Sequence, residues 1–312
     1  MQTSTLVQKT VPAWLPFSLL ITLGFIWGTG YSLARFATTH AVTPLGYSFW
    51  QSLGPAGVIS LFCWLIRNKG ADRSSSSALA HWPYYLIYGL SGIAIPNTNM
   101  YFASPHLPAG ILAMVVNTVP IMAYLMALAA RIERFRWSRF LGIGCAALGI
   151  GLIILPQAGL PQPGMIPWVL ISLLTPLSFA FCSVYIACSR PSGSHSLLLS
   201  AGTLIASSLL LAPLVFHSDG FYFFHYPLTV TDGIVLLEIL LSSMGYVLFF
   251  QLIKMAGPVY YSMVDTIVVL TGLFWGYLIF GETLNGWTGG AVVLILAALG
   301  LVTRGGRKEM TS

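Results

Sequence analysis

Long apolar runs, each about as long as a membrane-spanning helix, fill most of the chain and are separated by short breaks. A helix needs ~20 predominantly apolar residues to cross the hydrocarbon core of a bilayer. Only 7% of the 312 residues are charged, whereas soluble domains carry roughly a quarter. The pattern predicts an all-α integral membrane protein with ten transmembrane helices. Their expected ranges are 14–37, 45–66, 83–103, 107–129, 137–155, 165–189, 196–216, 234–254, 257–280 and 285–303.

The basic residues divide unevenly between the two ends of these runs. With ten spans, both termini and the loops after even-numbered spans lie on one side, and every Lys and Arg except Arg35 belongs to that side. Because cytoplasmic loops carry the excess of basic residues, both termini are expected in the cytoplasm. The expected location is a bacterial-type inner (plasma) membrane, with residues 1–13 and 304–312 as cytoplasmic terminal segments.

The second half of the chain repeats features of the first half. An offset of 149 residues aligns Glu133 with Glu282, each of which follows a long apolar run. Each half has five spans, and an odd number requires the two halves to insert with opposite orientations. Inverted repeats are typical of secondary transporters, whose substrate sites lie near the bilayer midplane between the repeats. We therefore expect one five-helix repeat over 14–155 and a second, inverted repeat over 165–303.

Three short segments carry a resemblance to a known family. They are Trp27-Gly28 through Arg35, the unit from Pro120 to Gly151 with Glu133 at its turn, and the repeat of that turn at Gly281-Glu282. The sequence resembles the EamA family of the drug/metabolite transporter (DMT) superfamily. The resemblance implies two inverted five-helix repeats around a central cavity, exporting or exchanging small metabolites. One departure is the first turn, which reads Arg131-Ile132-Glu133 instead of Gly-Glu.

Polar and aromatic residues inside the spans indicate where such a cavity lies. Prolines free backbone carbonyls at membrane depth, which is tolerated where the backbone faces protein or water, so they mark a cavity or hinge. The expected helix breaks are Pro55, Pro96, Pro120 and Pro176. The expected cavity residues are Trp27, Tyr31, Asn97, Asn99, Asn117, Tyr246 and Asp265. The alternative for the three asparagines is that their amides bridge neighbouring helices.

Two acidic residues lie inside spans, where ionisable groups are costly and are functional candidates. Asp265 lies about two turns into its span and is the first candidate for proton coupling or for binding a substrate ammonium group. Glu238 is the second candidate for proton coupling, although it is close enough to the outer end of its span to reach water. For Asp265 the alternative is a buried hydrogen-bonding role.

Enzyme signatures are missing from the sequence. It has no Gly-x-Ser-x-Gly elbow, no phosphate-binding loop and no histidine pair with metal-ligand spacing. We therefore predict no enzymatic activity, no metal, no cofactor and no nucleic-acid partner. The four cysteines have no disulfide or metal pattern and are expected to be packing residues.

The predicted function is secondary active transport, as an exporter of small amphipathic metabolites by alternating access of the two repeats. A phosphorylated substrate would need several Arg or Lys donors at depth, which the spans lack. A solute with an amine, such as an amino acid, fits better. The expected partners are this solute, membrane lipid and protons as coupling ion, for a monomer or homodimer. The alternatives are an uptake or exchange carrier, a channel, an intramembrane enzyme and a non-transport membrane scaffold.

Overall fold

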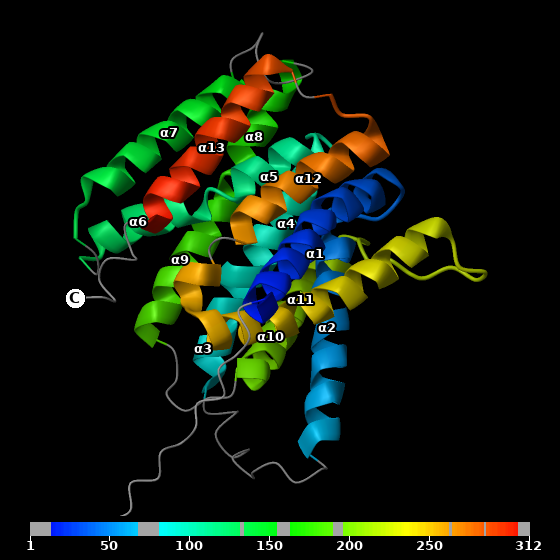
Figure 1. The fold of residues 1–312 in the computed structure, drawn as a ribbon. Helices are drawn as coiled ribbons and strands as arrows, with labels where there is room; N and C mark the ends of the chain where they lie inside the picture. Colours follow the sequence, from blue (N-terminus) through cyan, green and yellow to red (C-terminus); the bar gives the residue numbers. More distant parts are fainter. Residues whose placement is uncertain are drawn as a thin grey trace, which may run out of the picture.

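The computed structural model describes residues 14–67, 81–131, 134–154, 163–189, 196–261, 264–283 and 285–304. Every regular element in these ranges is a helix (Figure 1). The first half holds α1 (Trp14–Thr39), α2 (Pro44–Arg67), α3 (Trp82–Gly89), the π-helical turn η3 (Leu90–Ala94), α4 (Ile95–Ala103), α5 (Ala109–Val116), α6 (Val119–Ala129) and α7 (Trp137–Ile154). The second half holds the 3₁₀ turn η4 (Pro163–Met165), α8 (Ile166–Ser172), α9 (Leu174–Ser189), α10 (Ser196–His217), α11 (Val230–Tyr261), α12 (Val264–Phe280) and α13 (Gly286–Arg304).

These helices follow the apolar runs in order, with one wrong boundary. The break predicted between the runs 234–254 and 257–280, around Gly257-Pro258, is absent, because α11 continues to Tyr261. Proline inside a helix removes one backbone hydrogen bond, and neighbouring groups in a helix bundle can satisfy the freed carbonyl, so the helix need not end there. Glu133, the terminal segments 1–13 and 305–312 and most of the 67–80 loop lie outside the described residues.

Three of the predicted runs are interrupted rather than continuous. The run over 83–103 passes from α3 into α4 through η3, where the Ile95 amide bonds to the Leu90 carbonyl five residues back. The run over 107–129 divides at Asn117-Thr118, between α5 and α6. The run over 165–189 divides at Leu173, between α8 and α9. Interruptions of this kind in apolar helices often mark functional positions.

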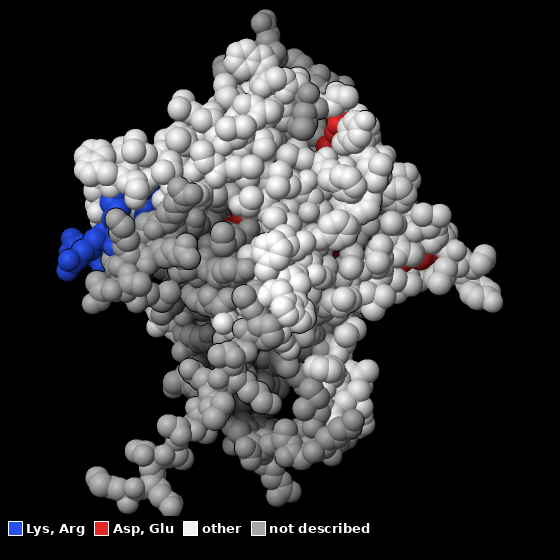
Figure 2. All heavy atoms as spheres, viewed as in Figure 1, with Lys and Arg blue, Asp and Glu red and all other residues white. Residues whose placement is uncertain are grey.

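The surface of the molecule suits a lipid environment. Five helices are long and apolar enough to cross a membrane by length and composition, and three shorter apolar helices accompany them. Large hydrophobic side chains such as Phe17, Leu148 and Leu209 are more than half exposed. Figure 2 shows one face on which charged side chains appear only in small, separate patches. An apolar surface of this extent is unfavourable in water and is typical of a membrane protein.

Helices from the two halves pack against each other throughout the fold. Helix α7 lies along α13 at one edge (Figure 1), α2 packs on α10, and α5 packs on α12. Helix α1 packs on both α11 and α12, while α9 packs on both α4 and α6. Helix α11 also contacts α2, and α10 contacts α3. The core is therefore shared between the halves and is not divided into two separate bundles.

Candidate functional site

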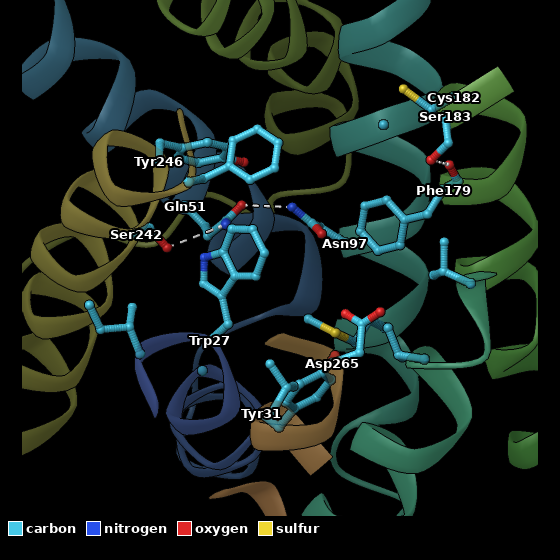
Figure 3. Close-up of a pocket in the computed structure, with 18 of the residues that line it drawn as sticks. Trp27, Tyr31, Gln51, Asn97, Phe179, Cys182, Ser183, Ser242, Tyr246 and Asp265 are labelled. Carbon is cyan, nitrogen blue, oxygen red and sulfur yellow. Dashed lines mark hydrogen bonds between the residues drawn. The ribbon is translucent and has the colours of Figure 1, made fainter. Parts of the chain in front are cut away.

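A cavity of about 410 Å³ lies between α1, α2, the α3–η3–α4 segment, the α5–α6 segment, α9, α11 and α12 (Figure 3). This volume falls in the range of small-molecule sites. Its walls are mainly apolar and strongly aromatic. The aromatic lining residues are Trp27, Tyr31, Tyr88, Tyr101, Phe179, Tyr246, Phe249 and Tyr261.

The charged groups in the lining are both acidic. They are Glu238 on α11 and Asp265 in the first turn of α12, and no Lys, Arg or His is among the described residues that line the cavity. Glu238 is buried, with 7% of its surface exposed. When they are ionised, these two carboxylates, with no basic residue in the described lining, make the cavity electronegative.

A chain of hydrogen bonds connects Glu238 to two amide side chains across the cavity. Ser242 donates to the Glu238 carboxylate over 2.8 Å, and Gln51 Nε2 approaches Ser242 Oγ at 3.5 Å. Asn97 Nδ2 donates to Gln51 Oε1 over 2.9 Å. Figure 3 shows the links from Ser242 through Gln51 to Asn97, which join α11, α2 and α4. The chain fixes one polar wall of the cavity and ties its position to three helices.

Asp265 has different surroundings. Its carboxylate points into the cavity (Figure 3), and it accepts no hydrogen bond from any residue in the described part of the chain. Tyr31 and Tyr261 are its electrostatic neighbours. Tyr261 belongs to an aromatic cluster with Trp27 and Phe249, with ring centroids 4.8–6.0 Å apart. Asp265 is therefore a carboxylate with its hydrogen-bonding capacity unused, at the edge of an aromatic wall.

The structure brings most of the predicted cavity residues together. Those that line the cavity are Trp27, Tyr31, Asn97, Tyr246, Asp265 and Glu238. Asn99 lies outside the lining, because two residues along a helix rotate a side chain by more than half a turn from Asn97. Its amide donates to the Ile171 carbonyl and to Thr175 Oγ1, both over 2.9 Å, and so bridges α4 to α8 and α9.

Asn117 also lies outside the lining. Its amide donates to the Ala113 carbonyl over 2.6 Å, at the break between α5 and α6. It also neighbours the Tyr31 hydroxyl. For Asn99 the structure therefore favours the helix-bridging alternative, whereas the Asn117 amide bonds to the carbonyl of the preceding turn of its own helix.

The four prolines fall into two groups. Pro96, Pro120 and Pro176 lie within the first three residues of α4, α6 and α9, each just after an interruption. A proline is tolerated there because the first turn of a helix has no partner for its amides. Pro120 also lines the cavity. Pro55 lies inside α2, which continues through it, so the structure shows no break at that position.

Gln51 is a cavity residue that the sequence interpretation missed. It is the one carboxamide in its apolar run, and 8% of its surface is exposed. A carboxamide inside a transmembrane helix needs a polar partner, and this is the signal that could have identified it. The serines around it made that signal less distinct, because serine often occurs at helix–helix contacts in membranes.

An ion pair joins the ends of α1 and α12 outside the cavity lining. The Arg35 guanidinium, near the end of α1, pairs with the Glu282 carboxylate, which follows α12. The same carboxylate accepts the backbone amides of Ala109 over 2.9 Å and Gly110 over 3.3 Å, at the start of α5. Glu282 thus joins α1, α5 and α12 by charge-assisted hydrogen bonds at a helix N-terminus.

Aromatic packing lies between this ion pair and the cavity. Tyr47 and Tyr101 meet edge to face with ring centroids 4.7 Å apart, and both are buried. From Tyr101 the lining extends in the opposite direction, to Tyr88, Ile186 and Phe249. The cavity therefore lies nearer the ends of the helices from which the basic loops emerge.

Comparison with known proteins shows which family and which proteins the chain is similar to. Residues 14–155 match the sequence model of the EamA-like transporter family. Protein PecM of Dickeya dadantii (strain 3937) is 25% identical over 288 residues, which cover 89% of this chain and 88% of that protein. A solved crystal structure aligns with a TM-score of 0.60 at 18% identity, covering 94% of this chain and 98% of the other, which shows a shared fold.

The family match and the apolar helices agree on the class of protein. Members of the family are transporters, and the helices are those of a multi-pass membrane protein. The resemblance seen in the sequence is confirmed: residues 14–155 match the model of the EamA-like transporter family.

Proposed function

We propose that the protein is a secondary active transporter that exports small amphipathic metabolites with an amine, such as amino acids. The observation that carries the proposal is the cavity of about 410 Å³ with aromatic walls and two carboxylates, built by helices of both halves. Ligand sites of transporters lie between such halves, near the middle of the bilayer. No basic side chain of the described lining would attract a phosphorylated solute.

The helix contacts support two inverted five-helix repeats, with ten spans in all. The repeats pair α1 with α8–α9, α2 with α10, α3–α4 with α11, α5–α6 with α12 and α7 with α13. When each helix is replaced by its counterpart in the other repeat, the α1–α12 contact corresponds to the α9–α6 contact. In the same way, the α1–α11 contact corresponds to the α9–α4 contact. The α2–α11 contact becomes α10–α3, while α2–α10, α5–α12 and α7–α13 map onto themselves. Chance packing would not reproduce its own contacts in this way.

Alternating access follows from the same arrangement. The two halves share the cavity, so rocking one against the other would open it first to one side and then to the other. The Arg35–Glu282 ion pair is suited to hold the end beyond Tyr101 closed. With both termini in the cytoplasm of an inner membrane, as the basic residues favour, this closed end faces outward.

Protons are the coupling ion that the lining favours. The sequence contains no phosphate-binding loop, so a solute gradient or an ion gradient has to supply the driving force. Asp265 and Glu238 are the carboxylates in the described cavity lining, and carboxylates inside the membrane are the groups that relay protons in many pumps and transporters. Exchange of protons for the solute at these carboxylates would export the solute at the expense of the proton gradient.

Counterflow in proteoliposomes tests this function. Purified protein is reconstituted with an unlabelled solute inside, and labelled amino acids and labelled phosphorylated metabolites are offered outside in parallel. The proposal expects accumulation of amine-bearing solutes only. Exchange of the phosphorylated set alone would overturn the substrate class, and net uptake without exchange would favour an uptake carrier. A well-folded protein that moves no solute would be a membrane scaffold.

A further inference from the structure

We infer that the solute bound in the cavity carries a net positive charge, so that an organic monocation with an aromatic or aliphatic body is preferred over a zwitterionic amino acid. The inference rests on the proposed transport function and narrows its substrate class. It follows from three features of the cavity: its charge balance, the unused acceptors on its two carboxylates and its aromatic walls.

The charge balance disfavours a solute with its own carboxylate. Glu238 and Asp265 are the charged groups of the described lining, and both are acidic. Arg35 pairs with Glu282 and is not among the lining residues. A zwitterion would bring a third carboxylate into an interior of low dielectric with no basic partner. A cation without a carboxylate avoids this repulsion and offsets one of the two acids.

The two carboxylates keep acceptor capacity for such a cation. Glu238 accepts one hydrogen bond, from Ser242, and Asp265 accepts none from the described residues. An ionised carboxylate has about four acceptor sites, and an ammonium group has three donors. Gly30 lies next to the Glu238 carboxylate and has no side chain to cover it. A Cβ atom at position 30 would lie 3.6–3.7 Å from the two carboxylate oxygens. An ammonium group therefore finds acceptors in the cavity that the protein itself leaves unsatisfied.

The donors of the cavity are neutral and partly occupied. Asn97 donates to Gln51, which itself faces Ser242. Tyr101, with only 2% of its surface exposed, adds a neutral hydroxyl to the lining. Neutral donors of this kind can orient a hydroxyl, an amide or a ring nitrogen, but they do not neutralise a solute carboxylate.

Aromatic side chains supply the remaining surface. Trp27, Tyr246 and Tyr88 lie on three different helices around the cavity. The faces of such rings attract organic cations and also pack against apolar bodies. Walls of this composition therefore favour both parts of an amphipathic monocation.

The test compares three probes that share one aromatic body. They are 2-phenylethylamine, a cation; phenylalanine, a zwitterion; and 2-phenylethanol, a neutral molecule. Binding to the purified full-length protein in detergent is measured by isothermal titration calorimetry at pH 7.5. The inference expects the amine to bind at least about tenfold more tightly than either other probe, which corresponds to ~1.4 kcal/mol.

Variants assign the preference to the cavity. In the Glu238→Gln, Asp265→Asn double variant the amine should lose its advantage over 2-phenylethanol, while binding of 2-phenylethanol itself stays within about twofold of wild type. Asp219→Asn removes an exposed carboxylate outside the cavity and serves as the matched control, with unchanged affinities. Retained binding of the neutral probe also shows that the double variant has kept its fold.

Two results would overturn the inference. One is phenylalanine binding as tightly as the amine; the other is a double variant that keeps the full preference for the amine. Counterflow with the same probes separates this failure from failure of the transport function. Exchange of phenylalanine without exchange of the amine would leave transport standing and refute the cation preference. Selective binding of the amine with no exchange of any solute would refute transport and retain the cation site.

Discussion

At the scale of single residues, Asp265 and Glu238 share one cavity but differ in their surroundings. Glu238 is buried and hydrogen-bonded into the Ser242–Gln51–Asn97 chain, whereas Asp265 accepts no hydrogen bond from the described residues. When a carboxylate is held in a hydrogen-bond network, gaining or losing a proton requires the network to rearrange. A carboxylate without hydrogen-bond partners can exchange its proton without such a rearrangement. Asp265 is therefore the better candidate for proton exchange, and Glu238 for holding the solute in position.

Asp265→Asn should remove the response of transport to pH. With an inward-directed proton gradient, solute efflux from vesicles containing the variant should fall to the rate measured without a gradient, because the amide cannot bind a proton. Glu238→Gln should weaken solute binding and keep a response to pH. Efflux at matched internal pH, with and without the gradient, measures both effects. A gradient response of wild-type size in well-folded Asp265→Asn protein would exclude Asp265 from coupling.

Glu282→Gln should loosen the end of the molecule that the ion pair closes. The variant loses the charge that holds both the Arg35 guanidinium and the amides at the start of α5. A loss of ~1.4 kcal/mol would raise the open population about tenfold. The measurement is the rate at which a membrane-impermeant maleimide labels a cavity cysteine from the outer face.

Arg35→Gln provides the matched control for the ion pair. If the two side chains act as one pair, the effects of the two substitutions are not additive. In the Arg35→Gln, Glu282→Gln double variant the cavity cysteine should then react with the maleimide no faster than in either single variant. Additive effects of the two substitutions would show that Arg35 and Glu282 act on this end independently of each other. An unchanged rate in both single variants would show that the ion pair does not control this end.

At the scale of helices, the sequence predicted where most elements lie but not which face each presents. The apolar runs were readable because a spanning helix needs a minimum length. The faces depend on neighbours that a single run does not reveal, which is why Asn99 was expected in the cavity and Gln51 was not. The continuation of α11 to Tyr261 was missed because the rule that proline ends a helix is weaker inside a helix bundle.

The start of α11 shows a local signal that could have been used. Thr229 and Asp232 form a reciprocal cap: the Thr229 amide donates to the Asp232 carboxylate over 2.7 Å, and the Asp232 amide donates to Thr229 Oγ1 over 3.3 Å. This spacing is a known signature of a helix start. Tyr222 donates to the same carboxylate, and burial together with this bond raises the pKa of Tyr222 to about 12, so it stays a donor at physiological pH.

Asp232→Ala should therefore destabilise the start of α11. The substitution leaves the Thr229 amide and the Tyr222 hydroxyl without their acceptor. We expect the Tm in detergent to fall by roughly 3 °C. Thr231→Ala, at the neighbouring half-buried position, is the matched control and should change the Tm little. Equal melting temperatures for wild type and Asp232→Ala would show that the cap does not stabilise the protein.

At the scale of the whole molecule, the sequence supports the class of protein more strongly than its site. The low charge and the apolar runs identify a polytopic membrane protein, and the family match over residues 14–155 supports a transporter. The substrate could not be read from the sequence, because selectivity depends on side chains from seven segments that meet only in the folded structure (Figure 3). The correspondence between the helix contacts of the two halves likewise becomes visible only in the folded structure.

The central claim is that one cavity between the two halves opens alternately to the two sides of the membrane. Its most direct test is the accessibility of a single cysteine at Ser183, which lines the cavity, in protein whose four native cysteines are replaced. Single cysteines at Ser75 and Asp219 report the cytoplasmic and outer sides, respectively, and also test the predicted topology. A membrane-impermeant maleimide is applied to right-side-out and to inverted vesicles.

The cysteine at position 183 should react from both sides of the membrane, and a bound solute should slow both reactions. The cysteines at positions 75 and 219 should each react from one side only, and from opposite sides. Reaction of the cavity cysteine from one side alone, under every solute and pH condition, would contradict alternating access.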